Sequence, residues 1–254
     1  MLDSHCHLND TQYTNEVDQI VNNFLSAGIE KAICVGCDPT SNKKAKEIAN
    51  TYNCVYYTVG IHPDDCYKYN EKELEEYLKA NDKKLLAVGE IGLDYYHNKD
   101  NKEDQIKVFE SQINLAKKYS LPIVIHCRDA YGDMLEILKR NAPFEHGAVM
   151  HCYSGSLEFA KELLKLGVKF SFTGTVTYKN AKTAQEVVQN LPNDSFFFET
   201  DSPYLTPTPY RGKRNEPKYV EEVYKFVADL KGISVKEMEK MADNNAKLFF
   251  KMFD

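Results

Sequence analysis

Short apolar runs recur eight times along the chain, and a segment with helical spacing separates each run from the next. In one such segment apolar side chains recur at Ile106, Phe109 and Ile113, which is the spacing of an amphipathic helix. Several runs, such as residues 196–198, are apolar at every position, as is typical of parallel strands that helices cover. The pattern predicts eight strands, at residues 2–8, 31–37, 55–61, 85–91, 122–127, 148–153, 169–172 and 196–200.

The alternation of strands and helices indicates an α/β fold. No long linker, low-complexity stretch or shift of composition divides the 254 residues, and eight-stranded β/α barrels commonly have about 250 residues. We therefore predict one domain, residues 1–254, folded as a single TIM-type (β/α)8 barrel. An open, doubly wound sheet is the alternative.

The segment after the eighth predicted strand, residues 202–217, contains four prolines and one glycine, which prevent regular structure. We expect a long loop there, at the active face of the barrel. Two helices should follow, at about residues 218–230 and 234–250, and Ser234 with Glu237 forms a capping-box signature at the start of the second. Both helices are expected to pack outside the barrel.

Composition excludes some classes of protein. A formal net charge of −6 argues against a basic coat for nucleic acid, although it allows a local basic patch. No apolar run approaches the roughly 20 residues that cross a bilayer, so no membrane span is expected. The seven cysteines are scattered without a disulfide-like framework, and residues 1–5 lack a basic region followed by an apolar run. We expect a reduced, cytoplasmic protein.

Metal-ligating side chains lie where the predicted strands end. His5 and His7 alternate along one strand, so both imidazoles point to the same face. The carboxyl ends of parallel strands converge at one mouth of a barrel, so the side chains that end other strands should join them. The predicted metal ligands are His5, His7, Glu90, His126, His151 and Asp201.

Imidazoles and carboxylates without clustered thiolates suit Zn²⁺, Mn²⁺ or Mg²⁺. Six ligands are too many for one open zinc site, so we predict two divalent metal ions bridged by Glu90, which lies between the two histidine groups in strand order. Such a pair binds phosphate oxygens and lowers the pKa of a water molecule. Glu90 and Asp201 are the predicted catalytic residues. Asp201 either orients and deprotonates the water or acts purely as a ligand.

The long loop carries Arg211, Lys213 and Arg214, which are predicted to contact phosphate, and Tyr204, which is predicted to stack on a base. A solvated charged loop is the alternative interpretation. Arg128, two residues after His126, is a further predicted phosphate contact.

Some conspicuous residues receive no predicted role. Cys34 and Cys37 have the spacing of redox and zinc motifs, but no second pair follows, and packing in a buried strand accounts for them. His97 and His146 fall in predicted loops and are treated as ordinary loop residues.

Five motifs, in order along almost the whole chain, resemble those of the TatD family of metal-dependent deoxyribonucleases. They are DSHCH at 3–7, GEIGLDY at 89–95, HCRDA at 126–130, HCYSG at 151–155 and ETDSP at 199–203. The resemblance implies a TIM barrel, a divalent metal pair and hydrolysis of DNA phosphodiesters, often as a 3′–5′ exonuclease. Its partner would be DNA that is single-stranded or has an accessible 3′ end, with no membrane and no obligatory protein partner.

The resemblance also implies individual roles. One metal would be held by His5, His7, Glu90 and Asp201, and the other by Glu90, His126 and His151. His62, in GIHP at 60–63, matches a family position near the scissile phosphate.

Two other functions remain open from the sequence. The same site would also serve a hydrolase of a small ester, amide or lactone, because the loops of a barrel, and not its fold, determine the substrate. A non-enzymatic scaffold with a structural metal is the third reading. It fits less well, because structural zinc sites are closed and usually rich in cysteine.

Overall fold

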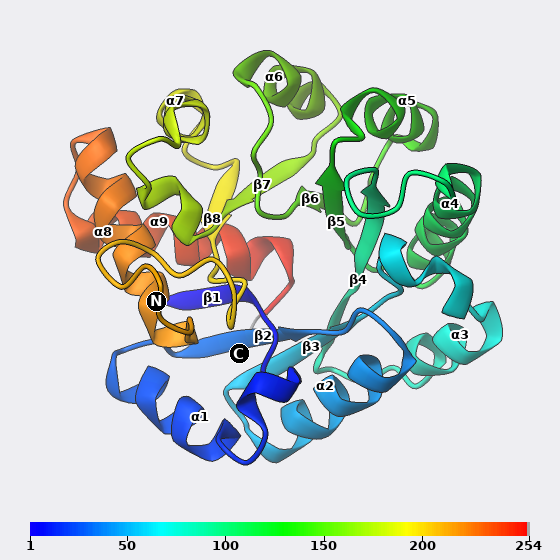
Figure 1. Ribbon diagram of the computed structural model, residues 1–254, viewed down its shortest axis with the longest axis horizontal. Coiled ribbons are helices and arrows are strands. Elements are labelled where there is room, and N and C mark those ends of the chain that lie inside the picture. Colours follow the sequence, from blue (N-terminus) through cyan, green and yellow to red (C-terminus); the bar gives the residue numbers. More distant parts are fainter. Residues whose placement is uncertain (253–254) are drawn as a thin grey trace.

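A computed structural model describes residues 1–252 and contains one sheet of eight parallel strands arranged as a nearly closed barrel (Figure 1). This confirms the predicted TIM-type (β/α)8 fold. Each strand pairs with the next, in the order β1 to β8. The strands are β1 (Leu2–Cys6), β2 (Lys31–Val35), β3 (Val55–Val59), β4 (Leu85–Asp94), β5 (Ile123–Arg128), β6 (Ala148–Met150), β7 (Lys169–Phe172) and β8 (Phe196–Phe198). The predicted domain ends at residue 254, two residues beyond the described part.

Helices surround the barrel (Figure 1). They are α1 (Val17–Ser26), α2 (Pro39–Thr51), α3 (Glu71–Lys79), α4 (Lys102–Lys118), α5 (Tyr131–Asn141), α6 (Leu157–Lys165), α7 (Lys182–Asn190), α8 (Val220–Lys231) and α9 (Val235–Phe249). Short 3-10 helices occur at Thr11–Tyr13, Pro63–Lys68, Gly174–Thr177 and Pro217–Tyr219.

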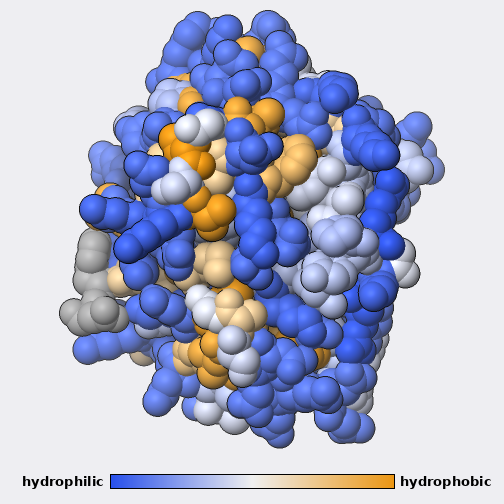
Figure 2. All heavy atoms as spheres, turned by 90° about the vertical axis from the view of Figure 1, so that its left-hand side faces the viewer, coloured by the Kyte–Doolittle hydropathy of each residue, from blue (hydrophilic) through white to orange (hydrophobic). Residues whose placement is uncertain are grey.

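The outward faces of the helices are polar. On the side that carries α8, most exposed side chains are hydrophilic, and apolar ones occur in small groups (Figure 2). The start of α9 has the predicted capping box, in which Ser234 accepts from the Glu237 amide and the Glu237 carboxylate accepts from the Ser234 amide. Among the described residues, no helix is both long and apolar enough to cross a membrane.

A small apolar core fills the inside of the barrel below its mouth. Inward-facing side chains such as Ile33, Val124 and Phe197 pack there with Phe250 and other residues from the end of the chain. α9 therefore covers the N-terminal ends of the strands. Both final helices pack outside the strands, but in different places: α8 lies against β8, whereas α9 lies next to α8 and across the bottom of the barrel. The apolar face of α9 is buried by the open bottom of the barrel, a partner that helical periodicity cannot identify.

The barrel closes at a seam between β1 and β8. An isolated bridge between Cys6 and Ser202 takes the place of a regular ladder. The amide of Asp201 donates to the His5 carbonyl at 2.9 Å, and the amide of His7 donates to the Ser202 carbonyl at 2.7 Å. The buried Asp3 carboxylate, further down β1, also accepts hydrogen bonds from the segment after β8. The seam therefore aligns the residues that follow β1 and β8.

Strand ends differ from the predicted ends in a way that affects the site. β4 continues to Asp94 and not only to residue 91, because it pairs with β5 from Ile91 to Asp94 beyond an irregularity in register. β6 and β8 end earlier than predicted, at Met150 and Phe198. His151 and Asp201 therefore lie in the first residues after their strands.

Candidate metal centre and active-site pocket

A pocket of about 980 Å³ opens at the C-terminal ends of the strands. Residues from the ends of all eight strands, or from the loops that follow them, line it. Five of the six predicted metal ligands are among them; the sixth, His5, is completely buried beneath. The seam and the parallel strands thus bring together side chains from both ends of the chain, as predicted.

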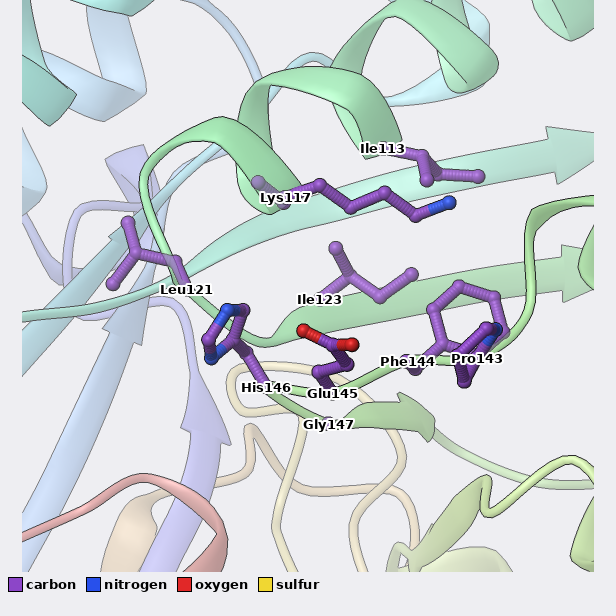
Figure 3. A pocket seen from close by; sticks show the side chains of 10 residues that line it. Ile113, Lys117, Leu121, Ile123, Pro143, Phe144, Glu145, His146 and Gly147 are labelled. Carbon is purple, nitrogen blue, oxygen red and sulfur yellow. The ribbon is translucent and has the colours of Figure 1, made fainter.

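A second, smaller cavity lies near the other end of the barrel and has a mainly apolar lining. It occupies about 250 Å³ between α4, the start of β5 and the loop before β6 (Figure 3). Ile113, Leu121, Ile123 and Phe144 line it, and its polar side chains include His146. None of the candidate metal-binding groups found among residues 1–252 lies in this cavity.

The first ligand set comprises His5, His7, Glu90 and Asp201. His5 Nε2 lies 3.3 Å from His7 Nε2, 3.4 Å from Glu90 Oε2 and 3.6 Å from Asp201 Oδ1. His7 Nε2 lies 3.2 Å from Asp201 Oδ1. A tetrahedral ion with ligands at about 2.0–2.2 Å would place them about 3.3–3.6 Å apart. The spacing and the mixture of imidazole and carboxylate therefore fit a divalent cation.

The second ligand set meets the other oxygen of Glu90. Glu90 Oε1 lies 2.8 Å from both His126 Nδ1 and His151 Nε2. Glu90 thus faces two histidine groups with its two oxygens, as a bridging ligand would. The two 2.8 Å contacts are direct hydrogen-bond distances, shorter than the separation of two ligands of one tetrahedral ion, so these side chains would have to move apart to hold a cation. Burial opposes ionisation of Glu90, but His151, through its charge and a hydrogen bond, and the hydrogen bond of His126 outweigh it and hold the pKa well below its usual range.

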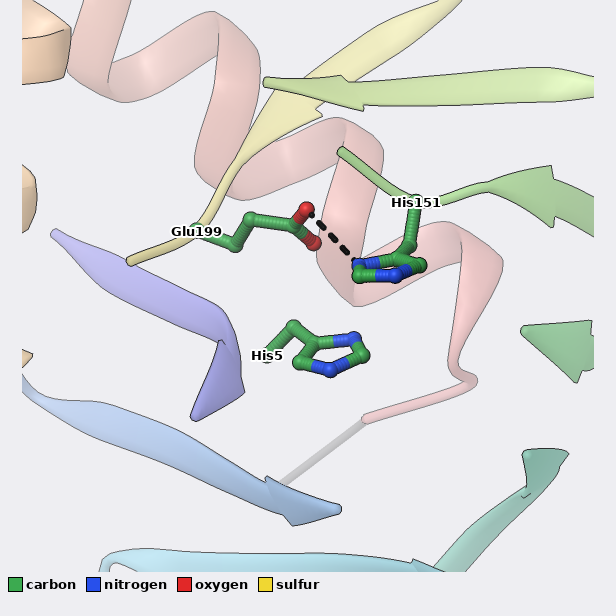
Figure 4. Close-up of side chains that lie close together, drawn as sticks. All are labelled: His5, His151 and Glu199. Atoms are coloured by element: carbon green, nitrogen blue, oxygen red, sulfur yellow. Dashed lines mark ion pairs between the residues drawn. The ribbon is translucent and has the colours of Figure 1, made fainter. Parts of the chain in front are cut away.

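Two further carboxylates stand behind the second set. Asp94 Oδ2 lies 3.0 Å from His126 Nε2, the ring nitrogen opposite the one that faces Glu90. Glu199 Oε1 lies 3.3 Å from His151 Nδ1, again on the far side of the ring (Figure 4). A carboxylate hydrogen-bonded in this way, as Asp94 is to His126, fixes the orientation and tautomer of a metal-ligating histidine. Glu199 is a close charged neighbour of His151, whose Nδ1 forms no hydrogen bond with a described residue.

Both carboxylates are themselves held in place. Asp94 Oδ1 accepts from the amides of Tyr96 and His97, each at 2.9 Å. Glu199 accepts from the Cys152 amide at 2.7 Å and from the Ser171 hydroxyl at 2.6 Å. The sequence prediction assigned neither carboxylate a role.

The first set has a different support. His7 Nδ1 lies 3.2 Å from the backbone carbonyl of Val35. His5 Nδ1 is buried without a hydrogen-bond partner among the described residues, and its ring stacks on His151 with centroids 4.1 Å apart. These two histidines are therefore positioned by the backbone and by ring packing.

His62 is oriented as a hydrogen-bond donor to the pocket. Its Nδ1 accepts from the Asp64 amide at 3.2 Å, so the proton of the neutral ring resides on Nε2. Burial and the neighbouring His126 lower the pKa of His62 to about 4, which keeps the ring neutral near pH 7. Nε2 lies 3.7 Å from Glu90 Oε1, on the side of the second ligand set. Although His62, Glu90 and His126 lie close enough to hold a metal ion, this tautomer directs an N–H, and not a lone pair, toward them.

Two other predicted substrate contacts, Arg128 and Tyr204, also line the pocket. The Arg128 guanidinium lies 3.9 Å from the centre of the Tyr96 ring. Tyr204 is half exposed, and its hydroxyl donates to Asp10 at 2.7 Å. Each side chain has an aromatic or polar neighbour that holds it at the rim.

The remaining predicted contacts lie outside the lining. Arg211 stacks on Tyr178 at 4.3 Å, and Lys213 lies 5.8 Å from the centre of the Tyr210 ring. These two cations stay predicted phosphate contacts. Arg214 is different, because it forms an ion pair with Glu16, the residue before α1. Its Nη2 lies 2.5 Å from Glu16 Oε2.

Two side chains that received no predicted role also line the pocket. His97 Nδ1 lies 2.9 Å from Asp94 Oδ2, so this histidine is not an ordinary loop residue. Cys37 Sγ lies 3.5 Å from Glu90 Oε2, so packing within a strand does not describe its place. Alternation beyond the end of β2 turns Cys37 inward, in phase with Ile33 and Val35. All seven cysteines are free thiols.

The chain resembles known proteins over its full length. Residues 2–251 match the family model described as TatD related DNase. The uncharacterized metal-dependent hydrolase YabD of Bacillus subtilis is 41% identical, over 99% of this chain and 99% of that protein. The crystal structure of YjjV, a TatD homolog from Escherichia coli, superposes with a TM-score of 0.94 at 28% identity, over 99% of this chain and 98% of that one. An uncharacterized amidohydrolase from Saccharomyces cerevisiae shares the fold, with a TM-score of 0.85 at 18% identity over 98% and 99% of the two chains.

Proposed function

The chain belongs to the TatD-related DNase family, and we propose that it is a metal-dependent hydrolase that removes nucleotides from the 3′ end of DNA. The observation that carries the proposal is the position of Glu90, whose two oxygens face two separate histidine groups beside an open pocket. An open pocket leaves room for water and substrate, which the closed ligand shell of a structural zinc site does not. This favours an enzyme over a metal-binding scaffold.

In this proposal one divalent ion is held by His5, His7, Glu90 and Asp201, and a second by Glu90, His126 and His151. Mg²⁺, Mn²⁺ and Zn²⁺ all suit this mixture of imidazole and carboxylate ligands. When bound, two such cations supply Lewis-acid activation of water and stabilise negative charge on the attacking and leaving oxygens.

Asp201 is the proposed proton acceptor. Its Oδ1 faces His5 and His7 at 3.6 and 3.2 Å, which leaves Oδ2 to orient the attacking water and take its proton. Burial opposes the ionised form, but the His7 hydrogen bond and the neighbouring imidazoles lower the pKa of Asp201. The carboxylate is therefore ionised and able to accept a proton at neutral pH.

His62 and Arg128 are proposed to bind the scissile phosphate. The N–H of His62 Nε2 would donate to a phosphate oxygen without adding charge, and the Arg128 guanidinium would supply a positive one. Tyr204 is proposed to stack on a base at the rim. Arg211 and Lys213 would contact phosphates further along the strand, and Arg214 would hold the long loop against Glu16.

Hydrolysis of a small ester, amide or lactone is the second candidate function. It is favoured by the acidic lining of the pocket, which includes Asp10, Asp38, Asp64 and Asp65, because a polyanion is repelled by carboxylates. A small neutral substrate would meet no such repulsion. The two candidates share the metal ligands and differ in their need for Arg128.

The deciding experiment follows end-labelled single- and double-stranded DNA with metal-stripped protein, with and without Mg²⁺, Mn²⁺ or Zn²⁺. We expect metal-dependent shortening from the 3′ end, lost in His126→Ala and retained in His146→Ala, whose histidine lines the other cavity. An RNA strand of the same sequence measures the preference for DNA. Absence of cleavage by folded, metal-loaded protein, together with hydrolysis of p-nitrophenyl acetate or a lactone, would establish the second candidate instead.

A further inference from the structure

Asp201, a proposed metal ligand and proton acceptor, lies in irregular backbone. β8 ends at Phe198, and beyond it the seam with β1 contributes an isolated bridge at Ser202. The φ of Asp201 is +54°, in the left-handed region that residues other than glycine enter infrequently. A residue in this region keeps its conformation when the surrounding groups hold it there. The groups that bond residues 200–204 therefore decide where the Asp201 carboxylate lies.

A buried amide brackets this segment. Asn215, in the long loop, is completely buried. Its Nδ2 donates to the backbone carbonyl of Thr200 at 3.0 Å and to that of Tyr204 at 2.6 Å. Its backbone amide donates to the Pro203 carbonyl at 3.0 Å. Both N–H groups of the side chain are thus used on the residue before Asp201 and on the residue three after it.

Asn215 is itself held by its neighbours. The hydroxyl of Tyr13, which is completely buried in the 3-10 helix after β1, donates to the Asn215 carbonyl. The Glu216 amide donates to Asn215 Oδ1 at 2.9 Å. Because an amide nitrogen cannot accept a hydrogen bond, this contact fixes which end of the side chain faces the two carbonyls. The support therefore connects the loop after β1 with the segment after β8.

This support reaches two functional side chains. Asp201 Oδ1 lies 3.2 Å from His7 Nε2, at the position proposed for the first cation. The Tyr204 amide donates to the Asp201 carbonyl at 3.0 Å, so the bracketed residues close one turn. Tyr204 is the residue proposed to stack on a base. Misplacement of a catalytic group by about 1 Å can lower a rate about 10²-fold, so the geometry of this turn matters for hydrolysis.

We propose that Asn215 is a positioning residue, whose amide fixes the backbone on both sides of Asp201 so that the carboxylate meets the first cation and the attacking water. The inference rests on the proposed function, and it applies to DNA and to a small ester alike, because both reactions need Asp201. Asn215 is not among the described residues that line the pocket, so it acts through Asp201 and not on the substrate. The sequence prediction assigned it no role.

The chain offers a matched control at the other end of β8. Asn245, on α9, also donates through Nδ2 to two backbone carbonyls, those of Asn193 at 2.7 Å and Phe196 at 2.8 Å. These carbonyls lie at the start of β8, whereas those bonded by Asn215 follow its end. The two asparagines therefore make the same kind of contact at opposite ends of one strand.

The first test compares cation binding by Asn215→Ala and Asn245→Ala. Each substitution removes an amide that bonds two carbonyls, and each should lower Tm by a few degrees. Asn215→Ala should in addition weaken binding of the first cation by about 10–100-fold and leave the second unchanged. Asn245→Ala should change neither affinity. Titration calorimetry with Mn²⁺, below the Tm of both variants, resolves the two affinities.

The second test measures hydrolysis at saturating metal. Asn215→Ala should lower kcat by about 10²-fold and change KM by less, because Asn215 does not contact the substrate. Asn245→Ala should keep both constants. A purely structural role for Asn215 would lower Tm alone, so unchanged kcat and unchanged affinity for the first cation would overturn the proposal. Equal weakening of both cations in the two variants would overturn it as well.

Tyr13→Phe is a milder change to the same support. It removes the hydroxyl that holds Asn215 and keeps the buried ring. We expect it to weaken the first cation, by less than Asn215→Ala does, and to leave the second unchanged. If Asn215→Ala does not fold, this variant takes its place, and unchanged affinity for both cations would then overturn the proposal.

Cation binding needs no hydrolysis, so the two proposals fail separately. If the unchanged protein cleaves neither DNA nor an ester with any metal, the proposed function fails, whereas selective loss of the first cation in Asn215→Ala would still support the positioning of Asp201. If the unchanged protein is active and Asn215→Ala keeps its kcat and its first cation, only the positioning role is overturned.

Discussion

The two halves of the proposed metal centre are built from the same residue types but supported differently. His126 and His151 each have a carboxylate behind the ring, provided by Asp94 and Glu199. His7 has a backbone carbonyl behind its ring. His5 forms no hydrogen bond through Nδ1 with a described residue, stacks on His151, and has a Glu199 oxygen within 4.8 Å of one ring nitrogen. A carboxylate makes an imidazole a more basic ligand, whereas a carbonyl mainly orients it. The second half therefore depends on side chains that substitution can alter, and the first half depends on the backbone and the seam.

Removing the ligand that both halves share should have the largest effect. Glu90→Ala should reduce metal binding in both halves and lower hydrolysis by more than the roughly 10²–10³-fold that the loss of one electrostatic contact costs. Metal content and single-turnover hydrolysis measure it. Circular dichroism should show an intact barrel, because one face of Glu90 borders the open pocket. Full activity in this variant would exclude a bridging role for Glu90.

Removing the metal tests whether the two proposed ligand sets bind cations. A cation present at 100 times its dissociation constant stabilises the folded state by about 2.7 kcal/mol, which corresponds to roughly 5–10 °C in Tm for a chain of this size. We expect chelated protein to melt that much lower, and Zn²⁺ or Mn²⁺ to restore the Tm. The double variant His7→Ala with His126→Ala should show a smaller increase in Tm when metal is added. An increase as large as in the unchanged protein would show that the proposed ligand sets are wrong.

Substituting the supporting carboxylates should affect one half and not the other. Asp94→Asn and Glu199→Gln should each weaken binding of the second cation by about 10–100-fold and leave the first unchanged. Titration calorimetry with Mn²⁺ resolves the two affinities. Asp133→Asn, which alters a carboxylate bonded to the Tyr95 hydroxyl, is the control. Equal weakening of both cations would contradict the division of the centre into two halves.

The Arg214–Glu16 ion pair belongs to neither half and should show the smallest effect. Arg214→Ala should cost no more than about 1 kcal/mol of unfolding free energy, because the pair is partly exposed. Arg128→Ala, in contrast, should weaken DNA binding and reduce its salt dependence by about one phosphate contact. Denaturant titration and binding across a salt series measure the two quantities. If Arg214→Ala also changed the salt dependence of DNA binding, Arg214 would be a phosphate contact, as the sequence predicts.

The sequence was most informative about residues whose positions follow from the order and direction of the strands. The ends of parallel strands must meet, so His5, His126 and Asp201 could be placed together from their positions alone. Strand alternation also carried a signal that was not used: Glu199 lies two residues before Asp201, and Asp94 four residues after Glu90, so each shares the inward face of its segment.

Other contacts had no local signal. The partner of Arg214 is Glu16, near the opposite end of the chain, and the sequence around either residue does not indicate the other. The extension of β4 to Asp94 depends on pairing with β5 beyond an irregular register. The position of α9 depends on the open bottom of the barrel, which exists only once all eight strands are assembled.

The seam between β1 and β8 has a consequence for the order of events during synthesis. His5 and His7 are translated well before Asp201, which emerges only after the last strand of the barrel. A nascent chain that ends before residue 201 lacks Asp201 and cannot complete the first proposed ligand set, whatever metal is present in the cell. Metal binding by that set therefore requires a chain that has been translated past β8 and in which β1 has met the segment after β8 at the seam.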